Sequence, residues 1–390
     1  MDASPTGERV RRLRKLRGLT QQDLARLARL SLRTVKTVEA DEGNPRLETL
    51  HAIARALVVQ TSDLTTPGHP EPDPVEPDRW EDVRAALYQR QVGGEPDEPA
   101  TVDGVLAALS ALMPAWRDSR YAEVRDVLPS LVRDALSLDE DGRVARSRVL
   151  NATAWMLTMT RQFDDAMTAG RLALDAAPDV SDSMAAVGVM AWCLLRQGRL
   201  SEAGDLAVEW ADRAEPRFSR ATDSELAAYG KVLLYVNNAM IRDNRPGEAE
   251  DALSLARAAA AKIRRDVPAN ASTTMTFGPA QVQIISAENA ALAGQPDRVL
   301  ALGERITGIG LARVEPAQRL RHRLDVASAH AMRRQYGDVV EVMTALRAEA
   351  PEWLAQQRYA RDILEGIIRR RRGPLTADLR ELATAVRLPL

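Results

Sequence analysis

A short polar turn, followed a few residues later by a small or β-branched apolar residue, recurs six times along this 390-residue chain. The residues at the equivalent place are Val124, Ala166, Ala203, Ala249, Val299 and Val339, at intervals of 42, 37, 46, 50 and 40 residues. From Trp80 onward no segment alternates apolar and polar residues for long, so strands are not expected. Small residues at this place let two antiparallel helices approach closely, and stacked helix pairs form a solenoid. The pattern predicts an all-α body, an α-solenoid, over residues 80–390.

A segment rich in proline and acidic residues precedes this body. The stretch TTPGHPEPDPVEPDRWED, residues 65–82, holds five prolines and six acidic residues. Proline lacks the N–H donor and fixes φ, so neither a helix nor a strand is expected to run through it. We interpret residues 67–79 as an extended linker. The alternative is an acidic segment that rests against a basic N-terminal domain.

Residues 1–66 show helical patterns separated by short breaks. A first helix is predicted to end at Gly18, and Thr20 with Asp23 resembles the capping box of a second. Ser31 caps a third helix, the segment RLETLHAIARALVV forms a fourth, and a short fifth begins at Thr61 or Ser62. The predicted inward-facing residues are Val10, Leu13, Leu16, Leu24, Ala25, Leu27, Ala28, Val35, Val38, Leu47, Leu50, Ile53, Ala54 and Leu57.

Charge is distributed unevenly between these parts. Residues 1–66 hold 12 Lys and Arg against 8 Asp and Glu, a net charge of +4. The whole chain carries −2, so residues 67–390 carry −6. A small basic piece on an acidic body predicts a polyanionic partner for the N-terminal piece alone.

Residues 7–66 resemble the Xre/lambda-repressor-like helix-turn-helix family. The resemblance rests on four spaced motifs: Gln21 to Ala25 (Q-x-x-L-A), Leu30-Ser31 (L-S), Val35 to Glu39 (V-x-x-V-E) and Pro45 to Leu50 (P-x-L-E-T-L). It implies a five-helix domain whose third helix lies in the DNA major groove. The implied DNA contacts are Gln21, Ser31, Leu32, Arg33, Thr34, Lys36 and Thr37, with Gln21 on a phosphate. The alternative is that Arg33 and Lys36 form an ordinary solvated helix face.

The resemblance also implies an internal ion pair, and it includes two departures from the family pattern. The pair joins Arg14 to Glu39 and ties the first helix to the third. Arg29 stands where the family usually has glycine, so we expect either a different turn or strain of about 1 kcal/mol. Asp41 and Glu42 occupy a loop where relatives often place basic phosphate contacts, which predicts weaker nonspecific DNA binding.

The body resembles tetratricopeptide arrays. The stretch RQFDDAMTAGRLALDAAP is the best repeat, with Ala154, Phe163, Ala166, Ala173 and Pro178 at consensus offsets. The other repeats are longer, and one has Trp210 where a small residue is expected. Together with the helix-turn-helix resemblance, this implies a transcriptional regulator whose body senses an effector or mediates dimerisation.

Four residues of the body are candidate ligand contacts. Aligning the repeats on Ala166, Ala203 and Ala249 places Trp155, Trp192 and Asn238 at one equivalent position, with Asn151 a turn before Trp155. In such arrays the first helix of each repeat lines the concave face. Asparagine hydrogen-bonds a peptide backbone in both directions, and tryptophan offers a flat apolar wall. The alternative is that the tryptophans pack in the core and the asparagines are ordinary polar residues.

Other classes of function find little support in the sequence. No apolar stretch approaches the ~20 residues of a membrane span, and the N-terminus lacks an apolar signal region, so a cytoplasmic protein is expected. No nucleophile, zinc-protease, P-loop or dinucleotide motif is present, so we expect no enzyme activity, cofactor or metal. We predict a homodimeric, sequence-specific regulator that binds a double-stranded DNA operator and responds to a peptide or small-molecule effector. A protein-interaction adaptor or scaffold with a vestigial DNA-binding domain is the alternative, and an enzyme is a distant third.

Overall fold

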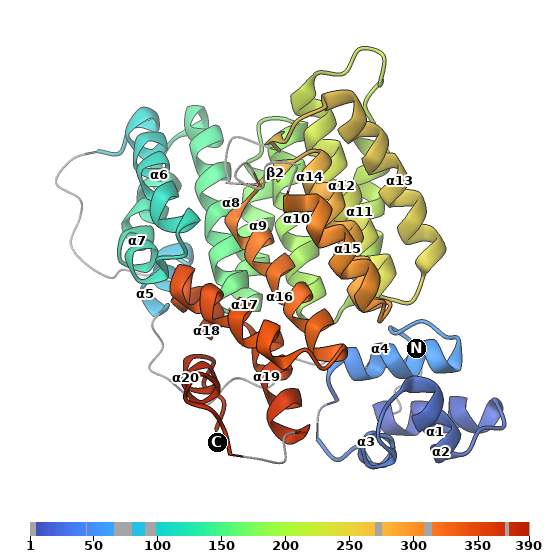
Figure 1. Cartoon of the computed structure of the whole chain (residues 1–390). Helices are drawn as coiled ribbons and strands as arrows, with labels where there is room; N and C mark the ends of the chain where they lie inside the picture. The colour runs from blue at the N-terminus through green and yellow to red at the C-terminus, as the bar shows by residue number, and fades with distance from the viewer. Residues whose placement is uncertain are drawn as a thin grey trace.

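The chain folds into a small helical domain beneath a large helical body (Figure 1). A computed structural model describes residues 5–43, 45–65, 80–89, 99–269, 275–307, 314–370 and 374–389, so the predicted linker at 67–79 lies outside the described residues. The small domain contains α1 Thr6–Leu16, α2 Gln21–Ala28, α3 Leu32–Glu39 and α4 Leu47–Leu57. None of the helices that the structure describes is long and apolar enough to span a membrane.

The small domain has its own apolar core, and its helix caps are those expected from the sequence. Thr20 and Asp23 form a complete capping box at α2, and the Ser31 hydroxyl accepts from the Thr34 N–H at the start of α3. The core consists of Val10, Leu24, Ala25, Ala28, Val35, Val38, Leu50, Ile53, Ala54, Leu57 and Leu64. Two inward assignments were wrong, because Leu16 is 76% and Leu27 50% exposed. Leu16 is the last residue of α1, and α2 buries only the narrow stripe of Leu24, Ala25 and Ala28.

The fifth helix expected at Thr61 or Ser62 is a single hydrogen-bonded turn. The Leu64 N–H donates to the Thr61 carbonyl at 3.0 Å, and Leu64 is fully buried in the domain core. The preceding amides are used elsewhere, because the N–H groups of Thr61 and Ser62 donate to Asp243 in the body. A longer helix therefore does not form in this segment.

The body is built almost entirely from helices, as expected. Its helices are α5 Glu81–Leu87, α6 Val102–Arg117, α7 Tyr121–Ser137, the short 3-10 helix η1 Glu140–Gly142, α8 Arg143–Met159, α9 Phe163–Asp175, α10 Val180–Arg196, α11 Leu200–Arg213, α12 Asp223–Arg242, α13 Pro246–Ile263, α14 Pro279–Leu292, α15 Pro296–Thr307, α16 Pro316–Met332, α17 Tyr336–Glu349, α18 Pro351–Ala355, α19 Arg358–Arg370 and α20 Ala377–Ala385. The described strands are β1 Val267–Pro268 and β2 Thr276–Phe277, which pair antiparallel.

The six repeated positions mark the second helix of each helical hairpin. They lie in α7, α9, α11, α13, α15 and α17, and each of these residues is at most 2% exposed. The hairpins α6/α7, α8/α9, α10/α11, α12/α13, α14/α15 and α16/α17 follow one another along the body. Burial of a small or β-branched residue at each close helix–helix approach explains the spacing pattern in the sequence.

The C-terminal part of the body returns to its first hairpin. In Figure 1 the orange and red helices α16 to α19 lie in front of the green helices. The Tyr121 N–H at the start of α7 donates to the Glu352 carboxylate of α18 at 3.0 Å. Glu315, just before α16, lines a narrow hollow together with Trp116 and Trp155. The two ends of the solenoid are therefore in contact.

The small domain docks on the body through α4 and the turn after it (Figure 1). The His51 Nδ1–H donates to the Arg242 carbonyl at the end of α12, at 2.9 Å. The next residues of the body continue the contact, because Asp243 accepts from the Ser62 N–H at 2.7 Å and Asn244 donates to the Val59 carbonyl at 2.9 Å. The last residue of α12 and the turn that follows it thus form a contact surface for the small domain.

A second docking contact joins α4 to α19. Arg46, at the N-cap of α4, contacts Asp362 at 2.6 Å and Glu365 at 2.8 Å. Leu47 packs against the apolar core of the body rather than within its own domain. These contacts fix the orientation of the small domain relative to the body.

Candidate nucleic-acid interface

The helix α3 presents a continuous polar face to solvent. Ser31, Leu32, Arg33 and Lys36 are exposed, and Thr34 and Thr37 are partly exposed. The helix buries Val35, Val38 and Glu39 on its opposite side. All the residues predicted to contact DNA from α3 therefore lie on its outer side.

The docked body leaves this face uncovered. The hydrogen bonds and ion pairs between domain and body that the structure describes come from Arg46, α4 and the segment after α4 up to Ser62. Within the part of the chain that the structure describes, no hydrogen bond or ion pair joins α3 to the body. Arg33 and Lys36 have no salt bridge among the described residues, so both cations are available to an anionic partner.

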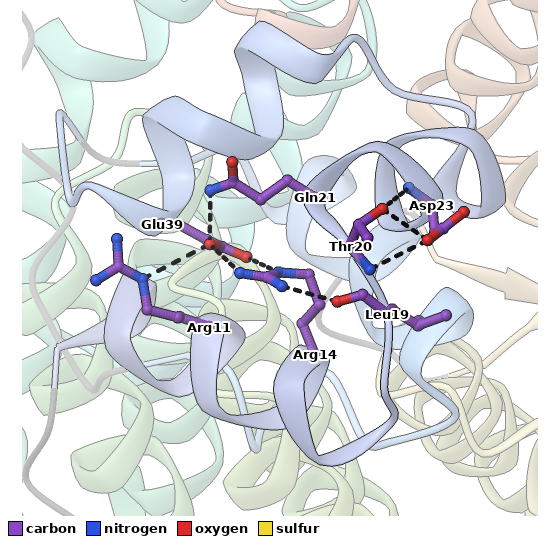
Figure 2. Close-up of polar contacts among 7 residues, drawn as sticks. All are labelled: Arg11, Arg14, Leu19, Thr20, Gln21, Asp23 and Glu39. Atoms are coloured by element: carbon purple, nitrogen blue, oxygen red, sulfur yellow. Dashed lines mark hydrogen bonds and ion pairs between the residues drawn. The ribbon is translucent and has the colours of Figure 1, made fainter.

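A buried carboxylate holds the first three helices together (Figure 2). Glu39 at the end of α3 accepts from Arg14 of α1 through two contacts, Nε to Oε1 at 2.5 Å and Nη2 to Oε2 at 2.9 Å. The Arg14 Nη1 also donates to the Leu19 carbonyl at 2.8 Å. This confirms the ion pair implied by the family resemblance, and its bidentate form fixes α3 against α1.

Gln21 at the start of α2 belongs to the same network. Its Nε2 donates to the Glu39 Oε2 at 2.9 Å, and Arg11 lies 3.7 Å from that oxygen on the outer side (Figure 2). The side-chain amide that we expected on a phosphate is therefore used inside the domain. Its role at DNA stays a prediction.

The environment of Glu39 lowers its pKa. Burial alone would raise the pKa of this carboxyl, but hydrogen bonds from Arg14 and Gln21, together with the charges of Arg14 and Arg11, outweigh it. The Glu39 carboxylate therefore stays ionised at pH values below the usual pKa of a glutamate.

The structure describes both departures from the family pattern and gives Asp41 a structural role. Arg29 ends α2 with φ 57° and ψ 34°, a left-handed conformation that favours glycine. Asp41 also has a positive φ of 54°, and its carboxylate accepts from the Gly7 N–H at 2.6 Å. Since the N-cap residue Pro5 offers no side-chain bond, Asp41 satisfies one of the free amides at the start of α1.

The candidate ligand residues of the body lie on the inner helices but are mostly covered. Trp155 of α8 and Trp192 of α10 stack with ring centroids 6.3 Å apart at an interplanar angle of 27°. Asn151 and Asn238 are buried, and the Asn238 Oδ1 lies 3.3 Å from the side-chain amide of Asn237. The structure brings the two tryptophans together, and no described contact joins Asn238 to them.

Sequence reasoning missed several polar residues around these tryptophans. Tyr121 and Glu315 line the hollow beside Trp155, and Lys231 is buried on α12. Arg196 follows Trp192 by one helical turn at the end of α10. Its only sequence signal was its place in an Arg-Gln pair that also occurs in the turns at 161–163 and 334–336, where an arginine is expected to be solvated.

Comparison with protein families and solved structures gives the following findings. Residues 10–64 match the model of the family described as "Helix-turn-helix". Bacillus thuringiensis PlcR, solved in complex with the peptide PapR7 and DNA, shares 13% identity over 80% of this chain and 99% of its own, with a TM-score of 0.38. Streptococcus suis ComR shares 14% identity over 90% of this chain and 96% of its own, with a TM-score of 0.28. No curated protein matches the chain.

Proposed function

We propose that this chain, whose residues 10–64 form a helix-turn-helix domain, is a transcriptional regulator that reads operator DNA with the outer side of α3. The observation that carries the proposal is the exposed Arg33 and Lys36 face, which makes no hydrogen bond or ion pair with the described part of the body. In a helix-turn-helix domain the second helix of the motif enters the major groove, and its N-terminal residues reach the base edges.

The side chains of α3 suit different parts of the DNA. Arg33 is long enough to donate two hydrogen bonds to a guanine edge, and Leu32 offers an apolar contact to a thymine methyl group. Ser31, Thr34 and Thr37 carry hydroxyls for base edges or phosphates, and Lys36 adds a positive charge beside them. Because the Gln21 side chain binds Glu39, we assign the phosphate contact at α2 to its first backbone amides.

The body serves as sensor and dimerisation module in this proposal. A second copy places two α3 helices on half-sites about one DNA turn apart, ~34 Å. A peptide or small-molecule effector binds the inner helices near Asn151, Trp155, Trp192 and Asn238. It changes DNA affinity only to the extent that it prefers one of two arrangements of the molecule.

Replacing Arg33 with alanine tests the reading face. We expect Arg33→Ala to lose about 1–3 kcal/mol of discrimination at one base position of the selected operator. Arg26→Ala, an exposed arginine on α2, is the control and should keep the base preference unchanged. The measurement is a gel-shift series over single-base operator variants. An Arg33→Ala protein with the wild-type preference at every position excludes α3 as the reader.

The same measurement separates the regulator from the adaptor. A DNA-binding domain that neutralises phosphates shows an affinity that falls steeply as salt rises. If the full chain binds no DNA at low salt, or binds with no salt dependence, the adaptor with a vestigial domain becomes the better description.

A further inference from the structure

The inner side of α10 carries two hydrogen-bond donors on adjacent turns, and the described part of the chain offers neither an acceptor. The Trp192 Nε1–H is buried and makes no hydrogen bond. Arg196, four residues later, makes no hydrogen bond or ion pair with any described residue. Residues four apart lie on the same face of a helix, so both donors point to one region. A buried donor left unpaired costs free energy, and such groups in native proteins call for an explanation.

Arg196 is partly exposed on the inner side of the body, and it differs from two other partly exposed arginines there. Arg242 pairs with Glu288, and Arg321 lies within 4 Å of both Glu288 and Asp325. The charged neighbours of Arg196 are instead the cations Arg161 and Arg321. Burial, followed by these two cations, lowers the pKa of Arg196 to about 10. Arg321 has acidic partners of its own, whereas no carboxylate among the described residues pairs with Arg196.

This region lies where distant parts of the body meet. Trp192 stacks on Trp155, and Trp155 lines the hollow shared with Tyr121 of α7 and with Glu315 next to α16. Burial raises the pKa of Tyr121, and the positive charge of Arg196 acts on it in the opposite direction. The two donors thus stand on the inner side of the closed solenoid, beside a flat aromatic wall.

We propose that Arg196 and the Trp192 indole N–H form a subsite for a carboxylate group of the effector. This inference rests on the effector sensing proposed above and names the chemistry of the ligand. The two oxygens of a carboxylate accept from the planar guanidinium in the paired geometry that arginine favours, and one of them also accepts from the indole N–H. The Trp155–Trp192 pair supplies the apolar surface for the adjoining part of the ligand. The carboxylate belongs either to a small organic acid or to the C-terminus of a peptide, and the two share the same recognition.

The first test needs no ligand and uses the full chain. Arg196→Met keeps most of the side-chain volume and removes the unneutralised charge, so we expect the body to unfold at the wild-type temperature or above it. The matched control is Arg242→Met, which leaves Glu288 buried without its partner and should unfold several degrees lower. If Arg196→Met loses as much stability as Arg242→Met, Arg196 has a structural partner and the proposal falls.

The second test measures binding with defined probes. Calorimetric titration of the full chain with benzoate should give saturable binding, and the neutral isostere benzamide should bind at least about tenfold more weakly. Arg196→Met should lose the preference for benzoate, whereas Arg199→Met, at the N-cap of α11 and paired with Glu202, should retain it. Equal binding of benzoate and benzamide to the wild type, or an unchanged preference in Arg196→Met, overturns the proposal.

A third pair of probes identifies the source of the carboxylate. Trialanine and its C-terminal amide are titrated in the same way. Preference for the free acid supports a peptide end, and a response to benzoate alone supports a small organic acid. No carboxylate preference in either pair overturns the subsite. DNA binding of the wild-type chain is measured separately, so failure of the regulator and failure of the subsite give different results.

Discussion

At the scale of single residues, Glu39 is central to the small domain because it contacts side chains from two other helices. Its buried carboxylate receives Arg14 from α1 and Gln21 from α2, so one side chain positions the three helices that precede the loop to α4. Removing it leaves the Arg14 guanidinium nearly buried without its anion, a large cost relative to the few kcal/mol that stabilise a small domain.

Glu39→Ala is expected to destabilise the small domain by about 3–5 kcal/mol. The control Glu42→Ala changes an exposed loop residue and should stay within about 0.5 kcal/mol of wild type. Chemical denaturation of the full chain, followed by hydrogen exchange of residues in α1 and α3, measures both. An Ala variant as stable as the control would mean that the ion pair adds nothing to the fold.

The Glu39 contribution also depends on pH, in a direction set by its lowered pKa. The stabilisation is present above the pKa of an unfolded glutamate, about 4.3, and is lost as the pH falls through the lower value in the folded state. The stability gap between wild type and Glu39→Gln should therefore be constant near neutral pH and shrink below about pH 4. A gap that widens on acidification contradicts the assigned shift.

At the scale of elements, the turn from α2 to α3 shows a conflict between residue and backbone. The family pattern places glycine here, and Arg29 adopts the left-handed conformation that glycine tolerates best. The motif spacing located this turn, and the sequence left open either strain or a different turn; the φ of 57° at Arg29 shows that the left-handed turn is kept. The strain energy at Arg29 arises because L-residues prefer negative φ.

Arg29→Gly is expected to raise the stability of the small domain by about 0.5–1 kcal/mol. Arg26→Gly is the contrasting control, because it places glycine inside α2 and should cost about 1 kcal/mol. Thermal unfolding of both variants in the full chain compares them. If both lower the melting temperature, the left-handed turn carries no strain that glycine relieves.

The helical hairpins could be predicted from the sequence because their signals are local. The site around Trp192 and Arg196 could not, because it depends on contacts between residues far apart in the sequence. Helix periodicity, capping residues and the buried small residues are local signals, so they identified the capping box at Thr20 and the hairpin helices around Ala166 and Ala203. The unsatisfied donors at Trp192 and Arg196 depend on residues from α7 and α16, which are far away in the sequence. The periodicity within one repeat does not predict which side chains from different repeats come into contact.

At the scale of the whole molecule, the end of α12 lies between the proposed effector site and the small domain. Asn238, a candidate effector contact, lies one turn before Arg242, whose carbonyl binds His51 of the small domain. The following Asp243 accepts a hydrogen bond from the amide of Ser62. One helix of the body is therefore in direct contact with the small domain, independently of the linker.

Loosening the docking should be visible without any ligand. We expect the double variant Arg46→Ala with His51→Ala to speed hydrogen exchange of the Thr61 and Ser62 amides, which donate to Asp243. The control Gln22→Ala lies on the exposed side of α2 and should leave this exchange unchanged. Mass spectrometry of peptides covering residues 59–65 provides the measurement. Unchanged protection in the double variant would show that Arg46 and His51 do not hold the domain.

The docking of α4 also limits which DNA-binding domains can be combined with this body. Arg46, Leu47 and His51 belong to the fold of the small domain, yet their partners are in α12, α19 and the core of the body. A foreign DNA-reading module grafted at the linker would lack these matched surfaces and hang loosely from the body. Chimeras that keep α4 and the turn at Thr61–Leu64 native, and replace only α1 to α3, are the ones expected to keep the native contacts with the body.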